Sequence, residues 1–185
     1  SLRKATQPEL TGRMYAFSCY RASEYVMLLG IAQEAASANP PLFARLQAQS
    51  HRRAIQSGEF HDVYLREYGS MDAPLPTRYY VPGDRVWFRN PDAASADAHG
   101  FEGSWVVYLG GGLFSNFWQR DRPFTLTRKC VEIYHWRHGA YRDADGGTRM
   151  DEDEVERRVA RSLSDPIELV RILALMQRPR DPRGV

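Results

Sequence analysis

The apolar residues of this chain change their spacing near Tyr80, and that change is the strongest constraint on its fold. From Met14 onward, apolar residues recur at the spacing of amphipathic helices. In YVPGDRVWFRNPD, which begins at Tyr80, and FEGSWVVYLGGGLFSNFW, which begins at Phe101, they alternate at the spacing of strands. Helical spacing returns near the end of the chain. This order predicts an α+β fold with an antiparallel meander between helical parts.

Two helices are predicted before the meander. Ser18 is a typical N-cap, and the helix that follows is expected to end near Ala36, because the run SANPP stops it. A second helix is expected over Leu42–Gln56, with Gly58 as its end.

Strands and two further helices are predicted in the second half. The triple glycine Gly110–Gly112 predicts a hairpin turn between strands. Residues Cys130–Trp136 alternate between two faces, which predicts another strand. Asp143–Gly147 is expected to be a turn, followed by a charged helix over Asp151–Ser162. A last helix is expected to start at Pro166.

The length of 185 residues favours one domain and is sufficient to bury a hydrophobic core. We expect a flexible N-terminal segment over residues 1–13 and a core over 14–140. A helical extension of the same domain is expected over 141–177, followed by a disordered tail over 178–185.

Composition narrows the class of function. The formal net charge is +2, whereas a dedicated nucleic-acid-binding domain is usually more basic, so no nucleic-acid partner is predicted. No apolar run is long enough to span a bilayer, and the start shows no signal-peptide pattern. A first residue other than Met favours a fragment of a longer protein. The sequence lacks phosphate-binding, dinucleotide-binding and EF-hand motifs, so no metal or organic cofactor is predicted.

Cys19 is the residue with the clearest chemical potential. A thiol in the first turn of a helix lies near the positive end of the helix dipole and beside free backbone N–H groups, which favour the thiolate. The alternative is an inert, buried cysteine. Cys130 lies in an aromatic segment and is interpreted as core. Two cysteines do not make a disulfide framework.

Three segments together resemble the spore-coat transglutaminases of bacilli. They are MYAFSC before the first helix, YVPGDRVWFRNPD, and EGSWVVYLGGGLF, and the resemblance covers about residues 14–118. The same arrangement is similar to the wider group of NlpC-type papain-like peptidases. The resemblance implies a papain-like fold in which the nucleophile opens a helix packed on the sheet. It assigns the role of nucleophile to Cys19.

The partner of the nucleophile departs from the family pattern. The resemblance places a catalytic glutamate (spore-coat enzymes) or histidine (NlpC-type enzymes) at the position of Ser104, and a neutral hydroxyl has little affinity for a proton. Glu102 points to the same side of an extended chain and is the first alternative base. His135 and His99 are further candidates, and Asn116 is the expected orienting residue. His61, like His99, is expected in a loop.

The resemblance implies acyl transfer on protein glutamine side chains. Cys19 would form a thioester and release ammonia, and a lysine or other amine would then take the acyl group. If water takes it instead, the glutamine is deamidated. Trp105, Phe117 and Trp118 are predicted to contact the substrate. The implied partners are protein substrates. An immunity or inhibitor protein is a further expected partner if the chain is a toxin domain, and no membrane partner is expected.

Two other functions remain open. One is a papain-like amidase or protease, and the other is a non-catalytic interaction domain with a degenerate site. The Arg- and Ala-rich composition and the abrupt start also suggest a toxin or effector domain from a secreted protein, delivered into a target cell.

Overall fold

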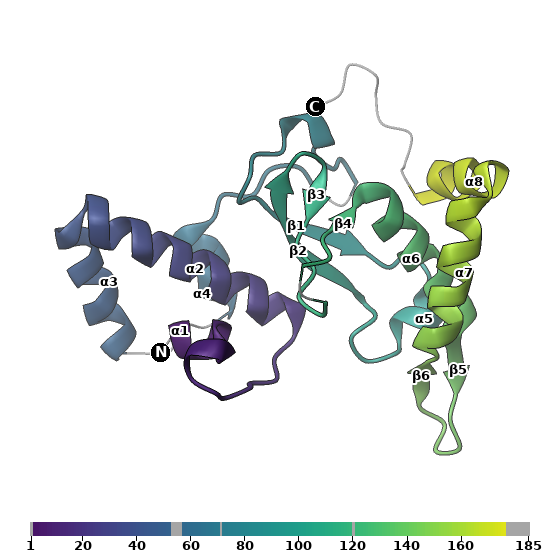
Figure 1. Cartoon of the computed structure of the whole chain (residues 1–185), viewed down its shortest axis with the longest axis horizontal. Helices are drawn as coiled ribbons and strands as arrows, with labels where there is room; N and C mark the ends of the chain where they lie inside the picture. The colour runs from purple at the N-terminus through teal and green to yellow at the C-terminus, as the bar shows by residue number, and fades with distance from the viewer. Residues whose placement is uncertain (1, 53–56, 71, 120, 177–185) are drawn as a thin grey trace. The chain divides into compact units, whose positions relative to one another are not determined.

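The computed structural model describes residues 2–52, 57–70, 72–119 and 121–176 (Figure 1). Contacts divide the chain into two compact units, Ser1–Pro74 and Leu75–Val185. Helices and antiparallel sheets coexist, which agrees with the predicted α+β class. Across the described ranges, no helix has the length and apolar character needed to cross a membrane. The predicted domain boundaries stay a prediction.

The first unit is helical. The helix α2 begins at Cys19, after the predicted cap Ser18, and ends at Ala38, two residues beyond the predicted end. Short helices also occur in the N-terminal segment, where the sequence predicted no regular structure. The elements of the unit are α1 (Leu2–Thr6), η1 (Pro8–Leu10), α2 (Cys19–Ala38), α3 (Pro40–Arg52) and α4 (Ser57–Tyr64).

The second predicted helix has other bounds than expected. It begins at Pro40, because proline is favoured at the first helical position and the side chain of Asn39 accepts a hydrogen bond from the backbone N–H of Leu42. Leu42, the predicted first residue of this helix, is exposed. The predicted end at Gln56 lies outside the described residues. Gly58 does not end this helix and instead lies within α4.

The second unit contains a four-stranded antiparallel sheet in the order β1-β2-β3-β4. The strands are β1 (Arg85–Arg89), β2 (Gly103–Gly110), β3 (Leu113–Phe114) and β4 (Phe124–Thr125). In the β1–β2 register, Trp87 pairs with Trp105 and Phe88 pairs with Ser104. The predicted glycine hairpin is confirmed, since Gly110, Gly111 and Gly112 all have positive φ, which L side chains rarely adopt.

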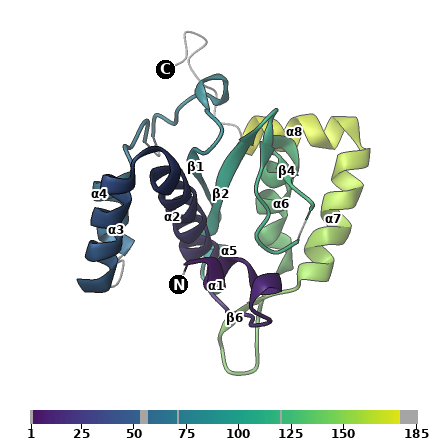
Figure 2. The same cartoon turned by 60° about the vertical axis from the view of Figure 1, so that its left-hand side comes forward.

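The predicted strand Cys130–Trp136 is wrong, because these residues belong to the helix α6 (Leu126–Gly139). Thr125 caps the helix by accepting a hydrogen bond from the backbone N–H of Arg128. Figures 1 and 2 show α6 between the sheet and α7. A helix buried on two sides has no single apolar stripe, so its sequence lacks the period of an amphipathic helix.

The helices α7 (Glu152–Ser164) and α8 (Pro166–Met176) pack with α6. The predicted helix start at Pro166 is confirmed, with Asp165 accepting backbone hydrogen bonds from α8. Asp151, predicted as the first residue of α7, is its N-cap. The core that joins the three helices contains Val131, Ile133, Tyr134, Trp136, Val155, Val159 and Ile172.

The remaining elements of the second unit are short. They are α5 (Ala93–Ala96) and a hairpin of β5 (Ala140–Arg142) and β6 (Thr148–Met150). The turn predicted over Asp143–Gly147 is confirmed, since the Asp143 carboxylate accepts a hydrogen bond from the Gly147 N–H at 2.7 Å. The predicted disordered tail, 178–185, lies outside the described residues.

Candidate active site

Cys19 is the first residue of the 20-residue helix α2 and is partly exposed. The extended backbone of Ser18 ends the preceding segment, and its hydroxyl accepts a hydrogen bond from the Arg21 N–H at 3.5 Å. The first N–H groups of a helix have no carbonyl partner within it, so they and the helix dipole favour negative charge near the first turn. The thiol therefore occupies the position that the sequence predicted for it.

The turn that follows Cys19 is buried. Ala22 and Ser23, three and four residues later, share its helix face and are buried. Ser23 donates a hydrogen bond to the Tyr20 carbonyl at 2.8 Å. Glu24 is fully buried and forms an ion pair with Arg21 at 3.0 Å. This packing fixes the backbone that carries the thiol.

An imidazole also approaches the start of α2. The ring of His61 lies 5.9 Å from the ring of Tyr20, the residue after Cys19. His61 lies in α4, not in the loop that was predicted, and the fully buried Phe60 beside it anchors that helix. The sequence indicated this helix only through two aromatic residues, Phe60 and Tyr64, which lie one helical turn apart.

Ser104 and Glu102 lie at the start of β2. Ser104 is 7% exposed and pairs with Phe88 across the sheet. Glu102 precedes the strand and is exposed, and its carboxylate accepts a hydrogen bond from the Gly100 N–H at 3.2 Å. Its backbone carbonyl accepts one from the Asn90 N–H at 3.1 Å, which fixes the chain on either side of the side chain.

Asn116 organises the loop between β3 and β4. Its Oδ1 accepts hydrogen bonds from the N–H groups of Trp118 and Gln119 at 3.0 and 3.1 Å. Its Nδ2 donates to the Arg122 carbonyl at 3.0 Å. Both ends of the amide therefore hold the loop, and only the second Nδ2 hydrogen is left to orient another group.

The three predicted aromatic contact residues differ in their surroundings. Trp105 packs on Trp87, with ring centres 5.0 Å apart, and the guanidinium of Arg85 lies 3.9 Å from its ring centre. Such a stack holds the indole rigidly. Phe117 is half-buried, whereas Trp118 is 68% exposed.

His135 lies in the interior of α6 and is 3% exposed. Its Nε2 is 2.8 Å from the Ser162 hydroxyl, and its Nδ1 is 3.2 Å from the Nδ1 of His138. Burial, together with the neighbouring His138, lowers the pKa of His135 to about 4. A group with so low a pKa is a weak general base at neutral pH, so this environment favours a structural role. His99 is exposed after α5.

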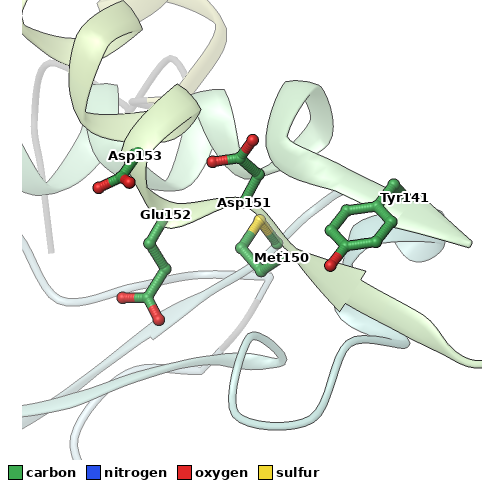
Figure 3. A pocket seen from close by; sticks show the side chains of 5 residues that line it. All are labelled: Tyr141, Met150, Asp151, Glu152 and Asp153. Atoms are coloured by element: carbon green, nitrogen blue, oxygen red, sulfur yellow. The ribbon is translucent and has the colours of Figure 1, made fainter. Parts of the chain in front are cut away.

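A shallow hollow lies between the β5–β6 hairpin and the start of α7 (Figure 3). It is lined by Tyr141, Met150, Asp151, Glu152 and Asp153, none of which was predicted as a site residue. The Asp151 carboxylate caps α7 by accepting the Glu154 N–H at 2.9 Å. Within the described part of the chain, no group of three or more His, Cys, Asp or Glu side chains has an arrangement suited to a metal ion.

The predicted site residues divide between the two units. Cys19 belongs to Ser1–Pro74, and the others belong to Leu75–Val185. In the second unit, Ser104 and Trp105 are neighbours on β2, and Asn116, Phe117 and Trp118 follow β3. His135 is separated from them in the sequence and lies inside α6.

The family comparison covers nearly the whole chain. The model of the protein-glutamine gamma-glutamyltransferase family matches residues 6–184. No curated protein and no solved structure matches the chain. The family match confirms the resemblance to bacterial transglutaminases and implies protein substrates. The chain therefore belongs to the protein-glutamine gamma-glutamyltransferase family.

Proposed function

We propose that this chain transfers the acyl group of protein glutamine side chains through a thioester on Cys19. The family match over residues 6–184 carries the proposal, because it implies protein-glutamine gamma-glutamyltransferase activity. The position of Cys19 at the start of α2 supports its role as the nucleophile, since a side chain in the first helical turn lies near backbone N–H groups that have no partner within the helix.

The reaction has two steps. The Cys19 sulfur attacks the carboxamide carbon of a substrate glutamine, the C–N bond breaks, and the nitrogen leaves as ammonia with the proton released by the thiol. A lysine amine then attacks the thioester carbonyl, the C–S bond breaks, and the thiol regains a proton that the amine loses. The product is an isopeptide bond. Water in place of the amine yields glutamate.

The first turn of α2 also suits the oxyanion of each tetrahedral intermediate. Its backbone N–H groups point out of the helix end, where the capping hydroxyl of Ser18 engages the N–H of Arg21. The N–H groups nearest the thiol are fixed in place by the buried turn of Ala22 and Ser23. Donors that are already in position lower the barrier, because they need no reorganisation as charge develops.

The proton acceptor for the thiol is the second part of the proposal. Glu102 is one candidate, because it lies two residues before Ser104, the position that holds an acid or histidine in the related enzymes. His61 is the other, because its ring contacts Tyr20 beside Cys19 within one unit. A carboxylate or imidazole accepts a proton far better than the hydroxyl of Ser104. Asn116 is proposed to orient the acceptor, and Trp105, Phe117 and Trp118 to contact substrate.

A papain-like fold is the architecture that we propose. A long helix that opens with the cysteine, followed along the chain by an antiparallel sheet, supports it. An effector or toxin role and an inhibitor partner are further hypotheses that rest on composition.

The test is mass spectrometry of a glutamine-rich acceptor protein incubated with the chain and a labelled primary amine. Amine incorporation is expected and should vanish in Cys19→Ala. Loss in Glu102→Gln but not His61→Gln identifies the carboxylate as the proton acceptor, and the reverse identifies the imidazole. Cys130→Ala is the matched control, because that thiol is buried in α6.

Other products would support other functions. Conversion of glutamine to glutamate without amine incorporation means that water is the acceptor. Cleaved peptide bonds mean a papain-like protease. Ser104 at the family's acidic position favours one further candidate, a binding domain without catalysis. The absence of every product across several acceptor proteins would overturn the proposal and favour that candidate.

A further inference from the structure

The basic residues of this chain are almost all arginines. Of 25 basic residues, two are lysines, Lys4 and Lys129, and the other 23 are arginines. The acyl acceptor in the proposed reaction is an uncharged primary amine. A guanidinium stays protonated at every relevant pH, whereas a lysine ammonium releases its proton and becomes nucleophilic. Arginines therefore contribute charge to the surface without offering an acceptor.

One of the two lysines is shielded by the fold. Lys129 is 1% exposed, and its Nζ lies 3.1 and 3.2 Å from the two carboxylate oxygens of Glu132. The ammonium also lies 3.5 Å from the ring centre of Phe124. Both contacts hold the amine in place, and its burial keeps a thioester from reaching it.

The other lysine is open to solvent. Lys4 lies in the short helix α1 (Leu2–Thr6), and its side chain is exposed. Donor side chains are more abundant, since Gln33, Gln47, Gln49 and Gln119 are all exposed. Within these 185 residues, the supply of accessible side-chain amines therefore limits any reaction of the protein with itself.

We propose that Lys4 is the one side-chain amine of these 185 residues at which the chain modifies itself, an inference that rests on the proposed function. The thioester formed on Cys19 from a donor glutamine is attacked by Nζ of Lys4. The C–S bond breaks, a C–N bond forms, and the amine proton returns to the thiol. The nitrogen of the donor glutamine leaves as ammonia earlier, when the thioester forms. When the donor is a glutamine of another copy, the product is a covalent dimer linked through Lys4.

The experiment uses the full chain with a fluorescent peptide that contains one glutamine and no lysine. Label is expected on Lys4, located by peptide mapping. In Lys4→Arg, which keeps the charge at an exposed position, label on the chain should fall at least tenfold, and covalent multimers on a denaturing gel should disappear. Adding Arg3→Lys to Lys4→Arg returns an amine to α1, and label should reappear at residue 3.

A second assay separates this inference from the proposed function. Incorporation of a small labelled amine into an external glutamine protein does not need Lys4, so it should be equal in the native chain and Lys4→Arg. If that activity is present but the label falls on Lys129, or is unchanged in Lys4→Arg, the inference is wrong and the function stands. If external incorporation is absent from the native chain, the proposed function fails and the inference fails with it.

The difference in accessibility between Lys4 and Lys129 can be measured separately. A limiting amount of an amine-reactive ester should acylate Lys4 well before Lys129. Equal acylation of the two lysines would overturn the inference, because its selectivity depends on the burial of Lys129.

Discussion

The Nε2 atom of His135 lies 2.8 Å from the hydroxyl oxygen of Ser162, and this hydrogen bond joins α6 to α7 inside the second unit. The other ring nitrogen of His135 meets His138 on the same helix. Arg158 and Arg161 on α7 oppose a positive charge on His135, and Glu168 on α8 partly offsets them. The native structure therefore holds His135 uncharged.

Acid should weaken the second unit through this histidine. The pKa of His135 is about 4 in the folded chain against an ordinary value of 6.5, so the unfolded chain binds the extra proton between those pH values. The stabilisation is complete above pH 6.5 and is lost as the pH falls towards 4, by about 3 kcal/mol at most. The pKa of His138 is lowered too, which acts in the same direction.

Urea unfolding at pH 7 and at lower pH values measures this effect. In His135→Gln the loss of stability on acidification should be smaller than in the native chain. His99→Gln, which removes an exposed histidine of the same unit, should keep the native pH dependence. An unchanged pH dependence in His135→Gln would contradict the prediction.

The two cysteines should respond differently to substitution. Cys19→Ala is expected to reduce amine incorporation by about a thousandfold or more, with a stability change within about 1 kcal/mol, because the side chain is only partly buried. Cys130→Ala should keep the activity and lower the free energy of unfolding by about 1 kcal/mol, since the thiol is buried. Steady-state rates and denaturant curves give both quantities. Equal losses of activity would remove the special role of Cys19.

Gly103→Ala should destabilise the sheet. A Cβ at this position would overlap the Trp87 ring and lie 2.6 Å from the Phe88 carbonyl oxygen, which is part of the backbone. Relief requires the strands to shift, at a cost of about 1–3 kcal/mol. Thermal unfolding of Gly103→Ala and of the native chain measures this loss of stability.

Gly30→Ala is the matched control for that substitution. Gly30 lies inside α2 and has open space where the Cβ would be added, so alanine should stabilise the chain by about 0.5–1 kcal/mol. A neutral Gly103→Ala would mean that Trp87 does not cover the glycine.

Ser104→Ala should leave amine incorporation within about threefold of the native rate, because a neutral hydroxyl does not serve as the base. Ser104 is nearly buried beside the partner strand, so alanine fits without strain. A comparison of kcat for Ser104→Ala and Glu102→Gln tests the assignment. A large loss in Ser104→Ala would give the hydroxyl a role in the reaction.

Local signals in the sequence predicted those parts of the fold whose cause is local. Ser18 set the start of α2, and the glycines at 110–112 set the hairpin, since each depends on a few adjacent residues. The helix α6 was missed because its residues contact protein on two sides, so burial there follows tertiary packing rather than a helical stripe.

The same distinction between local signals and tertiary packing applies to the candidate site. Cys19 was found from its cap and from the family motif. The bond between His135 and Ser162 joins residues 27 positions apart, and the contact of His61 with Tyr20 joins two helices. Neither pairing has a signal in the sequence, since the aromatic residues at 60 and 64 indicate the helix of His61 but not its contact with Tyr20. The burial of Lys129 was equally hidden, since an isolated lysine in a sequence is normally a surface residue.

The stacked indoles of Trp87 and Trp105 also give this protein an optical signature. Two rings with centres 5.0 Å apart and planes inclined by 33° couple their electronic transitions, which produces paired circular dichroism bands of opposite sign. The coupling depends on the pairing of these residues across β1 and β2, and a slip of one residue would move one ring to the other face of the sheet. The spectrum of the unlabelled protein therefore reports whether the strand that carries Ser104 is in its native register.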